Sequence, residues 1–379
     1  MAKIKVLSIF GTRPEAVKMA PVVKYLQDHP QIESRICVTA QHREMLDQVL
    51  NLFAIQPDFD LNLMQANQSL STLTANLFNA LDPFFEKIKP DWVLVQGDTT
   101  TVMAAAICAY YHQIKVGHVE AGLRTHHKYA PFPEEINRRI AGVTADLHFA
   151  PTEHSRQNLL QEGVPDWRIK VTGNPVIDAL QRMTQLPMPE KINHLLGEKR
   201  VLNGERQLIT ITAHRRESFG APFEGICQGI ARVADHFSDK VEMVYPVHLN
   251  PNVQEPAHRL LGNKANITLI EPVEYLALVH LLKQSRLVLT DSGGIQEEAT
   301  GLGKPTLVLR EVTERPEGVA AGVLKLVGTS SESIFEETRL LLENEELYSK
   351  MAHAANPFGD GHAAERIVQA ILDYHEEKA

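Results

Sequence analysis

Two carboxylates follow neighbouring apolar segments of the chain. Asp98 comes shortly after the apolar run 92–95, and Glu120 directly follows the run 116–119. If both runs are parallel strands, their carboxyl ends lie at one edge of a sheet, where ligands bind in open α/β folds. Two carboxylates in one place can divide the work of a general acid and a general base. The pattern predicts an acid–base site, although Asp98 alone would equally fit the N-cap of the next helix.

Further charged residues flank this predicted site. Glu134 and Arg138 are four residues apart and share a helix face, so they either extend the site or form a surface ion pair. The first apolar run ends in the segment 11–16, GTRPEA, which places Arg13 at a helix N-terminus, with Lys18 about one turn further on. A helix N-terminus attracts anions, so a phosphate site is one interpretation and a plain helix start is the other. The segment is not GxGxxG, and a dinucleotide is therefore not favoured.

The second half of the chain offers candidate anion-binding groups. His214 is followed by two arginines after an apolar run, and His248 follows the next run, where it could equally be a polar packing residue. A third run opens into Ser292, Gly293 and Gly294 before a helical pattern, and such glycines let a phosphate approach backbone amides. Glu298 would lie one turn into that helix, within reach of a ribose hydroxyl. Arg315 lies in a later loop that also follows a strand.

Metal chemistry has no support in the motifs. The sequence contains no HExxH or CxxC spacing, and no DxD pair at a strand end that would hold a metal on a diphosphate. Cys37, Cys108 and Cys227 each lie in an apolar stretch and are predicted to be core residues. We therefore expect no metal and no cofactor, with arginine and histidine supplying the positive charge.

The elements that must position these residues alternate along the whole chain. Short apolar runs alternate with helical patterns, which predicts parallel βαβ units and an α/β fold with two doubly wound, Rossmann-like domains facing a central cleft. The first domain is expected at 1–173 and the second at 174–360, with a junction where Gly173 precedes an Asn-Pro pair. A final helix within 361–379 has an apolar stripe and could complete the first domain.

Bulk properties exclude several classes of protein. The net charge of -9 lacks the basic footprint of nucleic-acid binding. No apolar run approaches the roughly 18 residues of a membrane helix. The first segment lacks a signal-peptide cleavage pattern and runs straight into the GTRPEA motif. We expect a cytoplasmic protein with neither nucleic acid nor membrane as a partner.

A family resemblance becomes visible once these segments are taken together. The chain resembles the non-hydrolysing UDP-N-acetylglucosamine 2-epimerases of bacteria along nearly its whole length. The blocks that carry the resemblance are FGTRPEAVKMAP, TAQHREML, GDTTT, GHVEAGLRT, PFPEEINRR, TGNPVIDAL, TAHRRESFG, YPVHLNPNV, DSGGIQEEA, ERPEG and NPFGDG. The resemblance implies the glycosyltransferase-B architecture, a homodimer, and no nicotinamide or metal.

The resemblance also implies roles for individual residues. Asp98, Glu120 and Glu134 match the carboxylates around the sugar, and Arg138 is expected to support Glu134. The stretch 271–278 is similar to the uracil-binding stretch, where Val273 and Leu278 stand at positions that often carry other residues. The positions that match UDP-binding ones are Arg13, Lys18, His214, Ser292, Gly293, Gly294, Glu298 and Arg315.

Some members of this family are activated by a second substrate molecule in an adjoining pocket. Gln41, Glu134 and His248 match residues of that pocket, whereas Glu44 and Asn67 stand where some members carry glutamine and arginine. Loss of an arginine would weaken the binding of a second diphosphate. Substrate activation is therefore a hypothesis for this chain.

The activity implied is reversible inversion at C2 of UDP-N-acetylglucosamine, giving UDP-N-acetylmannosamine by elimination and re-addition of UDP through 2-acetamidoglucal. His214 is counted with the three carboxylates as a catalytic candidate. Three alternatives remain at this point. A hydrolysing epimerase would release free N-acetylmannosamine, a glycosyltransferase of the same architecture would need an acceptor sugar, and a nucleotide-sugar sensor would bind without turnover.

Overall fold

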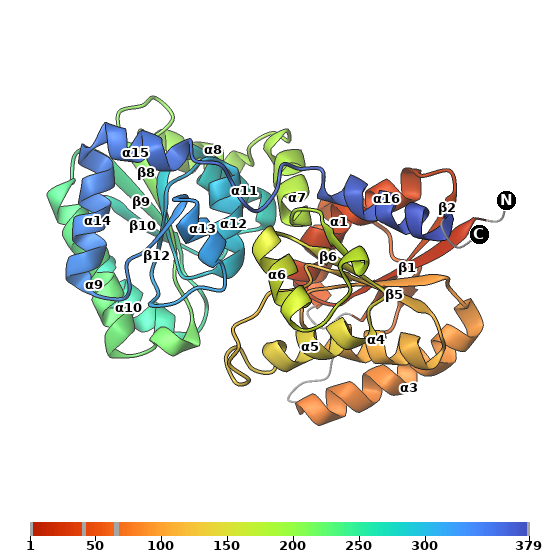
Figure 1. Cartoon of the computed structure of the whole chain (residues 1–379). Helices are drawn as coiled ribbons and strands as arrows, with labels where there is room; N and C mark the ends of the chain where they lie inside the picture. The colour runs from red at the N-terminus through yellow and green to blue at the C-terminus, as the bar shows by residue number, and fades with distance from the viewer. Residues whose placement is uncertain (1–2, 40–42, 64–67, 377–379) are drawn as a thin grey trace. The chain divides into compact units, whose positions relative to one another are not determined.

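The computed structural model describes residues 3–39, 43–63 and 68–376 (Figure 1). The chain divides into two compact units, which are Met1–Ala179 with Phe358–Ala379, and Leu180–Pro357. The division falls within a helix, α7 (Pro175–Thr184), that begins just after the junction expected at Gly173. We call the two parts the first unit and the second unit.

The first unit is built on a parallel sheet with the strand order β3-β2-β1-β4-β5-β6-β7. The sheet is doubly wound, because the chain moves outward from β1 in one direction and returns to its other side at β4. Its strands are β1 (Ile4–Phe10), β2 (Ile32–Val38), β3 (Phe59–Asp60), β4 (Trp92–Gln96), β5 (Lys115–Val119), β6 (Leu147–Ala150) and β7 (Ile169–Val171). Every residue of β4 and of β6 is buried, as expected for strands covered by helices on both faces.

The helices of the first unit lie between its strands, and the last helix of the chain joins them. They are α1 (Arg13–Asp28), α2 (Arg43–Leu52), α3 (Leu70–Ile88), α4 (Thr100–Tyr111), α5 (Glu134–Thr144), α6 (Glu153–Gln161), α7 and α16 (Ala363–Glu376). Helix α16 packs beside α1 (Figure 1). Its His375 accepts a hydrogen bond of 2.8 Å from the indole of Trp92 on β4. The C-terminal segment therefore belongs to the core of the first unit.

The second unit repeats the plan with the strand order β10-β9-β8-β11-β12-β13. Its strands are β8 (Gln207–Thr212), β9 (Val241–Pro246), β10 (Ile267–Ile270), β11 (Ser285–Thr290), β12 (Thr306–Val308) and β13 (Leu324–Leu326). Its helices are α8 (Glu190–Glu198), α9 (Ala221–His236), α10 (Pro251–Leu261), α11 (Tyr275–Gln284), α12 (Gly293–Gly301), α13 (Pro316–Ala320), α14 (Ser331–Glu343) and α15 (Glu345–Ala352). The α/β class and the two doubly wound sheets predicted from the sequence are confirmed.

The strand registers decide which loops meet. Gln96 at the end of β4 pairs with Val119 at the end of β5, so the segments after these two strands leave the sheet side by side. In the second unit Thr212 of β8 pairs with Thr290 of β11. Each sheet reverses its strand order at β1/β4 or at β8/β11, and ligands of such folds bind at this point. None of the described helices is long and apolar enough to cross a membrane.

Candidate active site

The loop after β1 is held by a buried carboxylate that the sequence analysis did not single out. Glu15, on the first turn of α1, accepts hydrogen bonds from the backbone of Gly11 at 3.0 Å and of Thr12 at 2.7 Å. Its other oxygen accepts from the hydroxyl of Thr99, after β4, at 2.7 Å. Burial raises the pKa of Glu15, opposed by these donors. Glu15 therefore links the two loops at the reversal point, with Arg13 at the start of the same helix.

Glu120 is the most enclosed of the three predicted carboxylates, with 5% of its side chain exposed. It forms an ion pair of 2.5 Å with Lys18 of α1 and accepts hydrogen bonds from Gln96 of β4 at 2.5 Å and from Asn174 at 2.8 Å. Its backbone is left-handed, with φ of 62°, which is uncommon for a residue other than glycine. Such strain is found where the surrounding structure enforces it, often at functional sites.

Asp98 lies at the same edge, and it is not the N-cap of α4. Thr99 caps that helix, accepting a hydrogen bond from the backbone of Val102. The Asp98 carboxylate accepts a hydrogen bond from Arg138, and 28% of the Asp98 side chain is exposed. Thr99 therefore fills the N-cap role that was the alternative for Asp98. The Asp98 carboxylate stays partly exposed at this edge of the sheet.

Arg138 was expected to support Glu134, and its described ion pairs are with two other carboxylates. Arg138 donates to Asp98 and, at 3.3 Å, to Glu135, which is completely buried. Glu135 also accepts from the backbone of Thr125 and His126. The reason is the rotation of α5, which turns Glu135 inward beside Arg138 and leaves Glu134, the first residue of the helix, half-buried. Arg138 thus positions Asp98.

A neutral histidine lies beneath this edge. His118 of β5 is buried and bonds through Nε2 to the carbonyl oxygen of Gly97 at 2.7 Å. Burial lowers the pKa of His118 to about 4, so its ring is uncharged near neutral pH. It supports the backbone just before Asp98 without adding charge.

The second unit gathers a histidine pair at the ends of β8 and β9. His214 stacks on His248, with ring centroids 5.3 Å apart and an interplanar angle of 12°. His248 is exposed, and its Nδ1 accepts a hydrogen bond of 3.1 Å from the backbone of Asn250. The Tyr245 hydroxyl donates to the carbonyl of Ala213 and supports the same loop. His248 was a candidate for a second-substrate pocket, and the structure brings it into contact with His214.

Ser292, Gly293 and Gly294 form the start of α12, as the sequence predicted. Ser292 is the N-cap residue but its side chain makes no capping hydrogen bond. The N–H groups of the first helical turn have no partner within the helix, and they face anions favourably. A Cβ on Gly293 would lie 2.8 Å from the Arg315 guanidinium, whereas a Cβ on Gly294 would meet no described atom within 4 Å.

Arg315 is fixed over this helix start. Its Nε donates to Glu297 of α12 at 2.7 Å, and the Arg315 side chain is 10% exposed. Glu298 lies one turn into α12 and is buried. The structure therefore brings His214, Ser292, the two glycines and Arg315 to one edge of the second sheet.

The remaining candidates are less informative. Val273, in the loop after β10, and Leu278, on α11, pack as partly buried side chains against apolar clusters of the second unit. Gln41 and Asn67 lie outside the described residues, and so does the side chain of Glu44.

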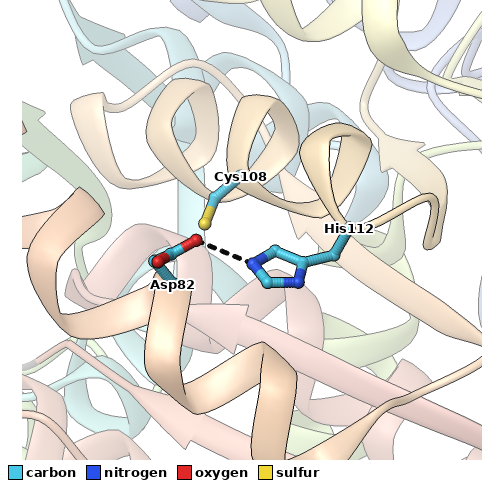
Figure 2. Close-up of side chains that lie close together, drawn as sticks. All are labelled: Asp82, Cys108 and His112. Carbon is cyan, nitrogen blue, oxygen red and sulfur yellow. Dashed lines mark hydrogen bonds and ion pairs between the residues drawn. The ribbon is translucent and has the colours of Figure 1, made fainter.

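One group among the described residues has the geometry to hold a metal ion. The ligand atoms of Asp82, Cys108 and His112 lie within 4.8 Å of one another, where α3 meets the end of α4 (Figure 2). His112 Nε2 bonds to Asp82 at 2.8 Å, and His112 packs edge-on against Phe85. Burial raises the pKa of the Cys108 thiol to about 11. The hydrogen bond between His112 and Asp82 accounts for this contact without a metal ion.

Sequence reasoning missed the residues that hold the others. Glu15, Glu135 and Asp291 are buried carboxylates that accept backbone hydrogen bonds, and Gln96 and Asn174 orient Glu120. A signal existed for Glu15, because Thr12-x-x-Glu15 is a capping-box pattern. The partners of Asp291, Gln96 and Asn174 lie 24 to 77 residues away in the sequence, and those of Glu135 depend on how α5 packs.

Comparison with known proteins identifies the family. A model of the UDP-N-acetylglucosamine 2-epimerase family matches residues 24–372. The UDP-N-acetylglucosamine 2-epimerase of Salmonella typhimurium is 54% identical over 373 residues, 98% of this chain and 99% of that protein. The crystal structure of UDP-GlcNAc 2-epimerase from Neisseria meningitidis, bound to UDP-GlcNAc, is 50% identical with a TM-score of 0.89 and covers 98% of this chain and 100% of that one. S. aureus MnaA, solved with UDP, is 47% identical with a TM-score of 0.90, over 98% of this chain and 97% of that one. This chain belongs to the UDP-N-acetylglucosamine 2-epimerase family.

Proposed function

We propose that the chain interconverts UDP-N-acetylglucosamine and UDP-N-acetylmannosamine and releases no free sugar. One observation carries the proposal together with family membership. A single edge of the first sheet gathers Asp98 and Glu120, each held by a cation, while an edge of the second sheet offers a glycine-rich helix start with His214 and Arg315. The first set suits proton transfer and the second suits a diphosphate.

The second unit is proposed to bind the nucleotide. Donors for the diphosphate are proposed to come from the amides at Gly293 and Gly294, the Ser292 hydroxyl, which makes no capping hydrogen bond, and the side chains of His214 and Arg315. Glu298 is assigned to the ribose, and Val273 with Leu278 to the surroundings of the uracil. Arg13 and Lys18, on the first unit, are also proposed to bind UDP.

The chemistry follows from the weak acidity of the C2 hydrogen. No carbonyl adjoins C2, so a base alone cannot remove its proton. Loss of UDP from C1 develops positive charge there, which acidifies the neighbouring C–H bond. Asp98, Glu120 and Glu134 are proposed to stabilise this charge and to exchange the proton, while His214 and Ser292 stabilise the departing diphosphate. The products of this step are 2-acetamidoglucal and UDP.

The reverse addition completes the inversion. UDP adds again to C1, and a proton is delivered to the opposite face of C2. No nicotinamide and no metal takes part in these steps as proposed. The final product again carries UDP at C1, which distinguishes this route from the hydrolysing alternative.

A single experiment tests the route. The purified protein is incubated with UDP-N-acetylglucosamine in heavy water and followed by proton NMR. We expect UDP-N-acetylmannosamine with deuterium at C2. Free N-acetylmannosamine would support the hydrolysing reaction instead, and an epimer without deuterium would contradict proton exchange. Binding of the UDP-sugar with no turnover would point to a sensor.

We also infer that the protein is a cytoplasmic homodimer. Two exposed tyrosines at the end of α4, Tyr110 and Tyr111, lie near the partly buried Phe78 of α3 and offer apolar surface for a second copy. Light scattering coupled to size-exclusion chromatography tests the dimer. Substrate activation stays a prediction, and a sigmoidal dependence of rate on UDP-N-acetylglucosamine would support it, whereas a hyperbola would count against it.

A further inference from the structure

Asp291 holds the loop that carries His214. It follows β11 directly, is completely buried, and its Oδ2 accepts hydrogen bonds from the backbone N–H of His214 at 2.6 Å and of Arg215 at 2.7 Å. Strand β11 lies beside β8, whose end leads into this loop. One carboxylate oxygen therefore sets the backbone of His214, and with it the place from which the imidazole projects.

The second oxygen of Asp291 could accept a hydrogen bond that is not made in the described part of this structure. Oδ1 is buried and has no hydrogen-bond partner among the described residues, yet it lies 3.7 Å from Nδ1 of His214. Buried acceptors are nearly always satisfied in folded proteins. A small rotation of the imidazole would bring an Nδ1–H within hydrogen-bonding distance of Oδ1. The geometry thus indicates a second state in which this bond is made.

The charges around His214 show what would select that state. Burial lowers the pKa of His214, the neighbouring His248 and Arg215 lower it further, and Asp291 with Glu217 opposes them. Glu217 itself forms an ion pair with Arg310, with 3.2 Å between Oε1 and Nη2. The ring is accordingly neutral in the empty protein at slightly alkaline pH. An anion near the ring would reverse this balance, because it favours the charged form.

We propose that Asp291 is a positioning residue that makes His214 a cation only when a diphosphate is bound. On binding, His214 takes one proton from solvent, donates Nδ1–H to Asp291 Oδ1, and presents Nε2–H to the diphosphate. The proton returns to solvent when the nucleotide leaves. This inference rests on the proposed function for the position of the diphosphate. It adds the uptake of a proton by His214 when the diphosphate binds.

The proposal is tested by calorimetric titration with UDP in buffers of different ionisation enthalpy at about pH 8, where the terminal phosphate of free UDP is already ionised. We expect uptake of about one proton per UDP bound, because His214 titrates well below this pH when the site is empty. His214→Gln should abolish the uptake. The matched control is His280→Gln, a histidine on α11 whose Nε2 bonds to the carbonyl of Leu186, and this change should leave the uptake intact.

Asp291→Asn separates the two oxygens. The amide oxygen can still accept from both backbone N–H groups, while its NH2 group replaces Oδ1 and cannot accept from the imidazole. We expect UDP binding roughly tenfold weaker, as for loss of one charged hydrogen bond, and proton uptake near zero. If this variant does not fold, NMR of the His214 ring nitrogens in the parent protein replaces it, with Nδ1–H expected to appear on UDP addition.

The outcomes are distinct. UDP binding without proton uptake in the parent would overturn the role of Asp291 and leave the proposed function standing. Uptake that survives His214→Gln and is lost in His248→Gln would also overturn it. Absence of UDP binding would contradict the proposed function itself.

Discussion

Gly294 offers a test of the diphosphate site that separates binding from folding. Gly294 lies in the first turn of α12, and a Cβ there would meet no described atom within 4 Å. Gly294→Ala therefore costs no packing, and it removes conformational freedom from the unfolded chain. Such a change stabilises a protein by about 0.4–1 kcal/mol where the backbone is compatible. We expect a melting temperature equal to or slightly above that of the parent protein.

The same methyl group would stand where the phosphate must approach. If it blocks one charged hydrogen bond from the backbone, the loss is about 1.5–3 kcal/mol, and UDP binding should weaken roughly 10- to 100-fold. Isothermal titration with UDP measures this, and thermal unfolding of the empty protein measures stability. A Gly294→Ala protein that folds and binds UDP as tightly as the parent would refute the assignment of this helix start.

Gly293 supplies the matched comparison. There a Cβ would lie 2.8 Å from Arg315 Nη1 and 3.0 Å from its Cζ, so the guanidinium would have to move. Arg315 is tied to Glu297 by an ion pair of 2.7 Å in which both side chains are largely buried. Gly293→Ala should therefore lower stability as well as UDP affinity, unlike Gly294→Ala. The two substitutions are thus expected to have opposite effects on stability. This difference separates a loss of affinity caused by disturbed packing from one caused by blocking the approach of the phosphate.

Three further changes probe the first unit. Asp98→Asn should lower turnover by about 100- to 10,000-fold, because the amide cannot exchange a proton. UDP titration should show nearly unchanged binding, and loss of both would assign a structural role. His118→Asn should make the free energy of unfolding less dependent on pH between about pH 4 and 6.5. The folded pKa of His118, about 4, lies below its unfolded value of about 6.5, so the unfolded chain binds more protons between these values and stability falls as pH is lowered through that window. Urea unfolding of the parent and the variant across this pH range measures the dependence. An identical pH dependence in the two proteins would contradict the burial of His118. Glu15→Gln should reduce stability by about 1–3 kcal/mol, because the amide nitrogen cannot accept and either the Thr99 hydroxyl or the buried N–H groups of Gly11 and Thr12 lose their acceptor. An unchanged unfolding midpoint in urea would contradict that role.

The placement of the candidate site residues was predictable because the strands are buried on both faces. Such strands appear in sequence as continuous apolar runs, and the residues that follow them fall at the carboxyl edge. Asp98, Glu120, His214 and Ser292 were located in this way. The short strands β6 and β7 were not predicted, since four and three residues give little periodicity to detect.

The partners of those residues were not predictable, for a physical reason that Arg138 illustrates. Glu134 at i−4 and Glu135 at i−3 both lie within reach on a helix. The choice between them depends on how α5 is rotated against the sheet, and long-range packing sets that rotation. Asp291 directly precedes the Ser-Gly-Gly motif, and nothing in the local sequence indicates that it holds the segment after β8, because the pairing of β8 with β11 joins segments far apart in sequence.

The carboxylates at these sheet edges fall into two kinds, those that hold loops and those that remain open to a ligand. The sequence does not distinguish the two kinds, but their burial does. Glu15, Glu135 and Asp291 are 2%, 0% and 0% exposed, and each accepts hydrogen bonds from backbone N–H groups of a loop. A carboxylate used in this way is committed to the fold. Asp98 retains 28% exposure of its side chain and is held by a guanidinium, which leaves an oxygen able to meet a substrate.

Glu120 combines features of both kinds. It is nearly as buried as the loop-holding acids, yet its described donors are side chains, Lys18, Gln96 and Asn174, which come from three separate segments. Side-chain donors can be rearranged when a ligand binds, whereas backbone donors move only with the loop. The described side-chain donors of Glu120 can therefore change when a ligand binds, which fits the proton exchange proposed for it. Burial and donor type together support the proposal that Asp98 and Glu120 take part in the chemistry, whereas the other three acids hold loops in place.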